Sequence, residues 1–222
     1  MVIGIIGAFD PEIDKYIDMY NMQKEDNNRF DIYVGYFNDK KIVMIKSGVG
    51  KVNAAIATQY LIDNYKIEYL INSGCAGSIS EKVNIMDVVI ADVVTYHDFK
   101  PIRIMESYVP ERGLIKPDPI LVNITKDVIN NIKNINYHVG VICTGDSFIE
   151  AEEMRNQINS LVGLVLAVDM ESAAIGHACK INKIPFLIIR TISDNADGVE
   201  NFEEEASYQS SYIVKEIVEY LK

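Results

Sequence analysis

The chain has 222 residues, a mass of 25.0 kDa and 49% hydrophobic residues. A chain of this size buries enough apolar surface to fold without disulfide or metal staples, which argues against disordered, collagen-like and disulfide-scaffold proteins. The 32 acidic and 21 basic residues give a formal net charge of −11 at pH 7. Because an acidic surface repels phosphate backbones and anionic lipid, we expect no nucleic-acid partner and no membrane partner.

The cysteines and histidines show no spacing typical of a metal site. Cys75, Cys143 and Cys179 are far apart and form no CxxC pair, and the chain has only three histidines. We therefore expect no metal and no cofactor, and we expect Cys143 and Cys179 to be buried apolar residues. Residues Met1–Glu12 lack the basic start and long apolar run of a signal peptide, and no later run has the length of a membrane span. These features predict a cytoplasmic protein.

Short apolar runs rich in Val and Ile recur along the chain and are nearly continuous, as strands covered on both faces require. They occupy Val2–Ala8, Ile42–Lys46, Tyr69–Asn72, Val88–Val94, Val139–Cys143, Leu164–Val168 and Phe186–Ile192. Helical spacing of apolar residues occurs in Val52–Tyr65, Ile120–Ile132, Ser172–Ile181 and Ala206–Leu221. This alternation predicts a single α/β domain over residues 1–222, with a mixed, largely parallel central sheet and helices on both faces.

Two segments interrupt the alternation. Phe30–Phe37 alternates in polarity and precedes the turn signal Asn38–Asp39, so we predict a hairpin with Lys41–Lys46 early in the sheet. Phe99–Pro119 contains four prolines and little periodicity, and there we predict a long loop that is functional or mobile.

Small residues and carboxylates follow the predicted strands, where open α/β sheets bind their ligands. These turns are Phe9–Glu12, Ser47–Lys51, Ser73–Ser78, Thr144–Ile149, Asp169–Ser172 and Ser193–Asp194. Each turn alone is also explained by the local needs of a strand–helix connection, and neither glycine turn matches a nucleotide-phosphate motif. Together, at one end of the sheet, they predict a ligand site.

Several motifs carry a family resemblance when they are taken in chain order. They are GIIGA at Gly4–Ala8, Glu12, KSGVGKVNAA at Lys46–Ala55, NSGCAG at Asn72–Gly77, TGDSFI at Thr144–Ile149, VDMES at Val168–Ser172 and RTISDNAD at Arg190–Asp197. The chain thereby resembles bacterial 5′-methylthioadenosine/S-adenosylhomocysteine nucleosidases of the purine nucleoside phosphorylase superfamily, and the likeness fails mainly in Phe99–Pro119. The resemblance implies a nucleoside phosphorylase-like fold. It also implies hydrolysis of the N-glycosidic bond of both thionucleosides, with adenine as one product.

The resemblance implies two catalytic carboxyl groups. Asp194 matches the family's general acid, which protonates adenine N7, and its place after an apolar strand fits a partly desolvated carboxyl. Ser193, beside it, is placed among the substrate-binding residues. Glu12 matches the glutamate that activates the attacking water. By position alone, Asp194 is equally typical of a helix N-cap, and Glu12 is typical of a surface residue in a first helical turn.

The resemblance also implies how the nucleoside is held. Glu171 would accept hydrogen bonds from the ribose 2′ and 3′ hydroxyls, with Met170 packed on the sugar. Asp169 stands where many relatives have Glu, and we expect it to face away from the ribose. Adenine would stack on Phe148 and pair with the backbone of Ile149, although Phe148 by itself is equally typical of a core.

Further residues match the family's tail pocket or depart from the family's pattern. Phe9, Val49 and Phe202 match positions around the 5′-alkylthio tail, where a thioether needs apolar walls. Cys75 takes a substrate-contact position that is commonly Ser, which weakens or removes a hydroxyl contact. Arg190 either orders acids near the site or forms a structural ion pair.

Three other functions stay open. A phosphorylase on this fold grips phosphate with arginines, whereas this chain has Glu12 and Asn72 at those positions, so water is the predicted nucleophile. A futalosine-type nucleoside hydrolase uses the same scaffold, and the unusual segment Phe99–Pro119 keeps that substrate open. A nucleoside sensor without catalysis would not need Glu12, Glu171 and Asp194 together. The resemblance further implies a small-molecule adenine nucleoside as substrate and a homodimer whose 99–119 loops cross between subunits.

Overall fold

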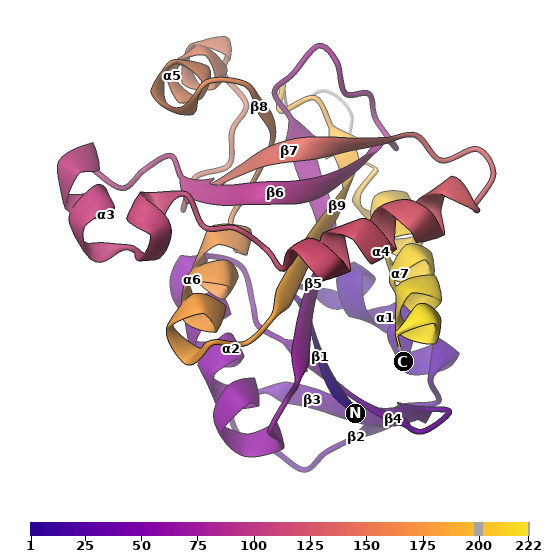
Figure 1. Ribbon diagram of the computed structural model, residues 1–222. Coiled ribbons are helices and arrows are strands. Elements are labelled where there is room, and N and C mark those ends of the chain that lie inside the picture. Colours follow the sequence, from indigo (N-terminus) through magenta and orange to yellow (C-terminus); the bar gives the residue numbers. More distant parts are fainter. Residues whose placement is uncertain (198–201, 222) are drawn as a thin grey trace.

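Strand β1 (Val2–Gly7) lies at the centre of the fold, in parallel pairing with β4 (Lys40–Lys46) on one side and β5 (Tyr69–Ser78) on the other. Most residues of these strands are buried, which explains why their sequences are nearly continuous apolar runs. The structure is a computed structural model that describes residues 1–197 and 202–221 (Figure 1).

Among the described residues, the strands form one 9-stranded mixed sheet in the order β2–β3–β4–β1–β5–β8–β7–β6–β9. The other strands are β2 (Gln23–Lys24), β3 (Asp31–Phe37), β6 (Val88–Tyr96), β7 (Tyr137–Thr144), β8 (Val165–Asp169) and β9 (Phe186–Asp194). Strands β3 and β4 form the predicted hairpin. Because β9 pairs with β6 and also with β5, the second half of the sheet curls back onto the centre.

Helices cover both faces of the sheet, as predicted (Figure 1). On one face lie α2 (Lys51–Tyr65) and α6 (Ser172–Asn182), and their buried side chains share an apolar core with Ile6. On the other face lie α1 (Asp10–Met19), α4 (Pro119–Asn130) and α7 (Glu203–Tyr220), which share a second core with Ile5. Consecutive strand residues point to opposite faces, so neighbours such as Ile5 and Ile6 belong to different cores. The predicted α/β fold class is confirmed.

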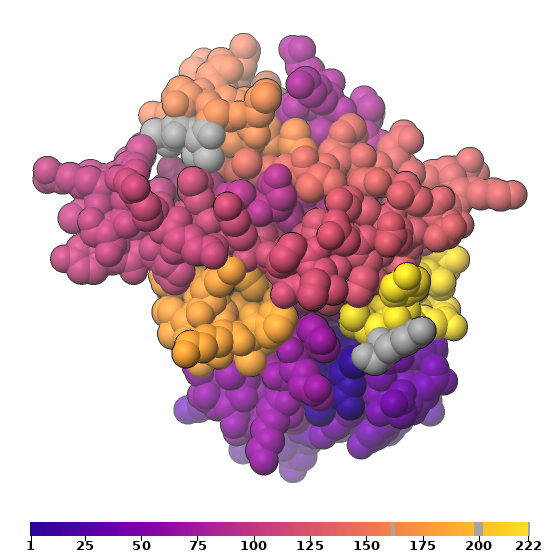
Figure 2. All heavy atoms as spheres, in the orientation of Figure 1, coloured from indigo at the N-terminus to yellow at the C-terminus, as the bar shows by residue number. Residues whose placement is uncertain are grey.

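The segment Phe99–Pro119 is not the long irregular loop that its prolines predicted. It contains α3 (Ile102–Tyr108) and the 3-10 helix η1 (Pro110–Gly113), and the space-filling view shows this part projecting from the molecule (Figure 2). Pro101 is the N-cap of α3 and Pro110 opens η1, where a missing N–H costs no helical hydrogen bond. Prolines therefore mark helix starts here, and a helix of 7 residues is too short to show a periodic pattern.

Two further predictions about elements were wrong or incomplete. Helix α5 (Glu152–Val162) was not among the predicted helices, and most of its described side chains are exposed. Residues Ser73–Ser78, expected to form a turn, instead continue strand β5. A side chain at Gly74 would collide with the Glu12 carboxylate and the Arg190 guanidinium, so this glycine makes room for neighbouring side chains in an extended strand.

The cysteines behave as predicted, since Cys143 and Cys179 are fully buried and Cys75 is partly buried. The structure contains no described helix with both the length and the apolar character needed to cross a membrane.

Candidate active site

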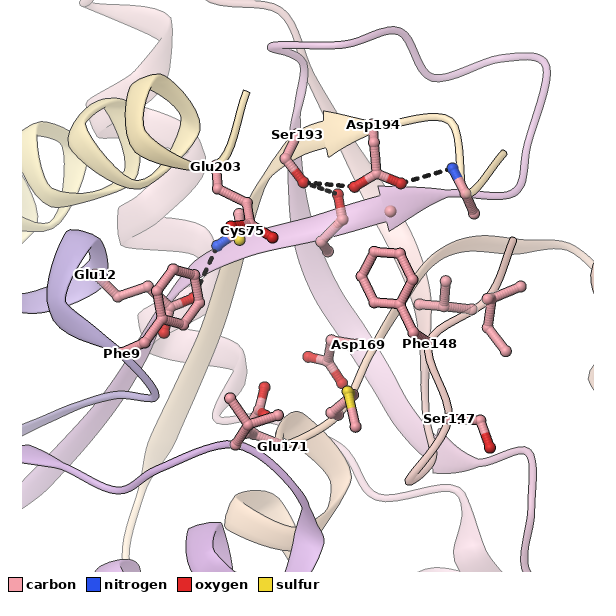
Figure 3. Close-up of a pocket in the computed structure, with 17 residues that line it drawn as sticks. Phe9, Glu12, Cys75, Ser147, Phe148, Asp169, Glu171, Ser193, Asp194 and Glu203 are labelled. Carbon is pink, nitrogen blue, oxygen red and sulfur yellow. Dashed lines mark hydrogen bonds between the residues drawn. The ribbon is translucent and has the colours of Figure 1, made fainter. Parts of the chain in front are cut away.

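A cavity of about 270 Å³ opens where strands β5, β8 and β9 reach the turns that the sequence singled out. Its walls include every predicted site residue except Phe202, namely Phe9, Glu12, Val49, Cys75, Phe148, Ile149, Met170, Glu171, Ser193 and Asp194 (Figure 3). Phe202 is the N-cap of α7 with a side chain 37% exposed, and its neighbour Glu203 lines the cavity instead.

Arg190 is the fully buried centre of the site. From strand β9 its Nη1 donates to Glu12 Oε1 at 3.0 Å and its Nε donates to Asp169 Oδ2 at 3.0 Å. Its Nη2 donates to Asn72 Oδ1 at 3.0 Å and reaches Glu171 Oε2 at 3.4 Å. A buried charge is tolerated only when it is paired and hydrogen-bonded, and here one guanidinium meets three carboxylates. Arg190 therefore both forms structural ion pairs and orders the acids, which unites the two roles that the sequence left open.

Glu12 is turned into the protein rather than exposed on the first turn of α1. The residue is 2% exposed, Oε2 accepts from Ala8 N at 2.5 Å, and Oε1 accepts from Cys75 N at 3.0 Å. Burial raises the pKa of Glu12 above its ordinary value, although Arg190 and the two backbone N–H groups oppose the rise. The buried carboxylate is therefore a stronger base than an exposed glutamate and is suited to take a proton from water.

Glu171 is the buried N-cap residue of α6, and its carboxylate is held from both sides. Oε1 accepts from Gly50 N at 2.9 Å, and Oε2 faces Arg190. Burial raises the pKa of Glu171 to about 7, against the pull of Arg190 and with the help of the neighbouring Asp169 and Glu12 charges. Glu171 thus changes protonation state near neutral pH.

Asp169 lines the cavity, and its carboxylate is held by neighbouring side chains. That it faces away from the ribose stays a prediction. Its Oδ1 accepts from Thr144 Oγ1 at 2.5 Å, while Ser172 Oγ and Arg190 Nε both donate to Oδ2. These contacts hold both oxygens of the carboxylate and pair it with Arg190.

Asp194 lies at the other end of the cavity, buried at the end of β9 (Figure 3). Ser193 Oγ donates to its Oδ2 at 2.7 Å and Ala196 N donates to its Oδ1 at 2.7 Å, which fixes the plane of the carboxyl. Phe148 lies across the cavity from it with a side chain 54% exposed, so Phe148 is not a core residue. An exposed ring opposite a fixed acid can stack on a flat heterocycle that the acid contacts at its edge.

Cys75 lines the cavity from strand β5, where its backbone already binds Glu12. Burial raises the pKa of its thiol well above the ordinary value, and the charges of Glu12 and Glu203 add to the rise. The thiol therefore stays protonated and is a poor nucleophile.

Two features of the site were missed from the sequence. Glu203 points toward Cys75 from the first turn of α7 (Figure 3), but three consecutive glutamates in that turn gave no signal of which one faces inward. Gly50 supplies a backbone donor to Glu171, which no side-chain motif can reveal. In residues 1–197 and 202–221, no group of three or more His, Cys, Asp and Glu side chains is arranged to hold a metal ion.

The chain is similar over nearly its whole length to known proteins. The family described as the phosphorylase superfamily matches residues 2–219. A 5′-methylthioadenosine/S-adenosylhomocysteine nucleosidase of Exiguobacterium sp. strain AT1b is 36% identical over 231 residues, which cover 100% of this chain and 99% of the relative. The crystal structure of such a nucleosidase from Neisseria meningitidis, in complex with methylthio-immucillin-A, has a TM-score of 0.92 at 32% identity and covers 99% of both chains. The futalosine hydrolase of Helicobacter pylori also has a TM-score of 0.92, at 28% identity, covering 100% of this chain and 98% of its own.

Replacing Arg190 should destabilise the protein strongly. In Arg190→Met three buried carboxylates lose their cation, so the free energy of unfolding should fall by about 3–5 kcal/mol. Urea denaturation at neutral pH measures the change. Arg112→Met is the control, because Arg112 is exposed and lies 3.7 Å from Glu106, and it should change stability little. Equal effects of the two substitutions would contradict the central role of Arg190.

The raised pKa of Glu171 predicts a pH dependence of stability. Its folded-state pKa of about 7 exceeds the ordinary 4.5, so the folded state binds the proton more tightly. The contribution of Glu171 is therefore fully present below about pH 4.5 and is lost as pH rises through about 7. Over this range the free energy of unfolding should fall less steeply in Glu171→Gln than in the wild type. The exposed Glu150→Gln should keep the wild-type slope, and an unchanged slope in Glu171→Gln would refute the assignment.

Proposed function

The chain belongs to the phosphorylase superfamily and to its 5′-methylthioadenosine/S-adenosylhomocysteine nucleosidases, and from this premise we propose how its cavity cleaves these nucleosides. The protein is an N-glycosyl hydrolase that releases adenine and the matching thioribose from both substrates. One observation carries the mechanism: the cavity holds a fixed acid, Asp194, at one end and a buried base, Glu12, at the other (Figure 3).

Asp194 is the proposed general acid. Adenine stacks on Phe148, beside the backbone of Ile149, with its N7 edge toward Asp194. Ser193 and Ala196 hold the carboxyl in one plane, so the proton can pass to N7 without a rotation of the side chain. The proton on N7 lets the base leave as neutral adenine when the bond between C1′ and N9 breaks.

Glu171 is the proposed ribose anchor. Its carboxylate accepts hydrogen bonds from the 2′ and 3′ hydroxyls while Met170 packs on the sugar. Gly50 N and Arg190 fix the orientation of this carboxylate before substrate arrives. Its negative charge also stabilises the positive charge that develops on the ribose in the transition state.

Glu12 is the proposed base for the attacking water. As the new bond between the water oxygen and C1′ forms, one water proton passes to Glu12. Phosphate is disfavoured in place of water, because the described residues of the cavity wall include five acids and no lysine or arginine. Arg190, a buried cation behind that wall, is already paired with three carboxylates.

The 5′-alkylthio tail is proposed to lie against Phe9 and Val49, with Cys75 on the adjoining wall. We propose that a second copy of the chain completes this end of the cavity in a homodimer. Support comes from exposed apolar side chains on α2 and α3, among them Val52 and Tyr108. A cytoplasmic location stays a prediction.

Futalosine is the second candidate substrate. The likeness to the Helicobacter pylori futalosine hydrolase is as close in TM-score as that to the Neisseria meningitidis nucleosidase. Both reactions break an N-glycosidic bond on one scaffold, and parallel assays of the two kinds of substrate distinguish them.

The proposed function predicts adenine release from methylthioadenosine and adenosylhomocysteine in phosphate-free buffer. Asp194→Asn should lower kcat by about 100-fold or more, because an amide cannot deliver the N7 proton. The matched control is Asp92→Asn, which changes an exposed aspartate on β6. Futalosine and adenosine are offered in parallel, with ultraviolet detection of the free base. Turnover of futalosine without release of adenine from either thionucleoside would contradict the substrate assignment. Activity that requires added phosphate would contradict the assignment as a hydrolase.

A further inference from the structure

Three charged residues form a cluster beside the cavity without lining it. Lys51 is the first residue of α2, Asp98 follows β6, and Asp146 lies in the turn after β7. Lys51 Nζ lies 2.5 Å from Asp98 Oδ2 and 3.5 Å from Asp146 Oδ2. We call these residues the Lys51 cluster. The mechanism above gives none of them a role.

The cluster ties two turns together through backbone as well as side-chain atoms. The backbone N of Lys51 donates to Asp146 Oδ1 at 2.8 Å, and the backbone N of Asp146 donates to Asp98 Oδ2 at 3.0 Å. Gly50, the N-cap of α2, has φ of 100°, which favours glycine, and a glycine brings no side chain to cap the helix. Asp146 supplies that missing cap from the other turn, so the start of α2 and the turn after β7 depend on each other.

Each of these turns also carries a group that the proposed function uses. Gly50, next to Lys51, donates to Glu171, and Val49 lines the cavity. Phe148 follows Asp146 by two residues and is half exposed, so core packing does not hold it in place. The distance between Glu171, the proposed ribose anchor, and the Phe148 ring therefore depends on the contacts of Lys51, Asp98 and Asp146 that join the two turns.

Lys51 offsets the repulsion between the carboxylates of Asp98 and Asp146. Without its ammonium, the carboxylates of Asp98 and Asp146 would face each other with no cation between them. Burial raises the pKa of Asp98, but hydrogen bonds from Lys51 and from Asp146 N outweigh it and hold the pKa below its ordinary value. Asp98 is thus charged at neutral pH and attracts both partners.

We propose that Lys51 is a positioning residue of the nucleosidase, which holds the turns carrying Gly50 and Phe148 at the spacing that lets adenine and ribose bind together. The inference rests on the proposed function. The effect is on binding, because the Lys51 cluster touches neither the scissile bond nor the proposed acid and base.

The test is steady-state kinetics of Lys51→Met with methylthioadenosine. Its KM should rise about tenfold while kcat changes much less, since the lost contacts serve ground state and transition state alike. Inhibition by free adenine should weaken in parallel, because adenine contacts the turn that bears Phe148. Lys51→Arg should restore most of the loss, since a guanidinium can reach both carboxylates.

Lys180→Met is the matched control. Lys180 has a similar side-chain exposure, 29% against 24% for Lys51, and pairs with Glu111 at 3.0 Å away from the cavity. Asp146→Asn is the second variant, because it keeps an oxygen for the Lys51 N–H but loses the charge, and it should raise KM by a smaller factor.

The proposal is overturned if Lys51→Met lowers the melting temperature as Lys180→Met does but leaves KM and adenine inhibition at wild-type values. It is also overturned if Asp146→Asn has no effect on KM. A wild-type protein that releases no adenine from methylthioadenosine would instead contradict the proposed function, so the two failures are distinguishable.

Discussion

One guanidinium buried among three carboxylates fixes the arrangement of the whole site. Arg190 comes from β9, Glu12 from the first turn of α1, Asp169 from the end of β8, and Glu171 from the N-cap of α6. Removing Arg190 leaves three buried carboxylates without their cation, which costs several kcal/mol. Segments that are far apart in the sequence are therefore joined at the cavity by ion pairs as well as by sheet pairing. The strands must meet in this register for the guanidinium to reach all three carboxylates.

This cluster also separates the two chemical roles that the reaction needs. Glu12 is kept in the cluster, where burial raises its pKa and backbone donors fix its orientation. Asp194 lies at the other end and is held by a hydroxyl and a backbone N–H. We propose that Glu12 acts as the base and Asp194 as the acid from these two positions in the cavity. The acidic wall at the same time disfavours phosphate, which is why the chemistry that fits this cavity is hydrolysis.

Much of the fold was predictable, because a strand that is buried on both faces has a nearly continuous apolar sequence. The segment Phe99–Pro119 was not, since its prolines open short helices whose stability comes from tertiary packing rather than from periodicity. The residues around Gly74 were predicted to form a turn, because glycine is typical of turns; here it instead makes room for Glu12 and Arg190 beside a strand. The motifs, taken in chain order, predicted most of the residues that line the cavity. They did not predict which role Arg190 has or that Glu203 faces the cavity, because both depend on residues that are distant in the sequence.

The most direct test of the account is the identity of the sugar product when methylthioadenosine is cleaved in saturating phosphate. Phosphorus NMR distinguishes a sugar phosphate from inorganic phosphate in the same sample. The account predicts adenine and free methylthioribose, with inorganic phosphate unchanged, because the acidic wall and the committed Arg190 leave water as the nucleophile. Accumulation of methylthioribose 1-phosphate would contradict it.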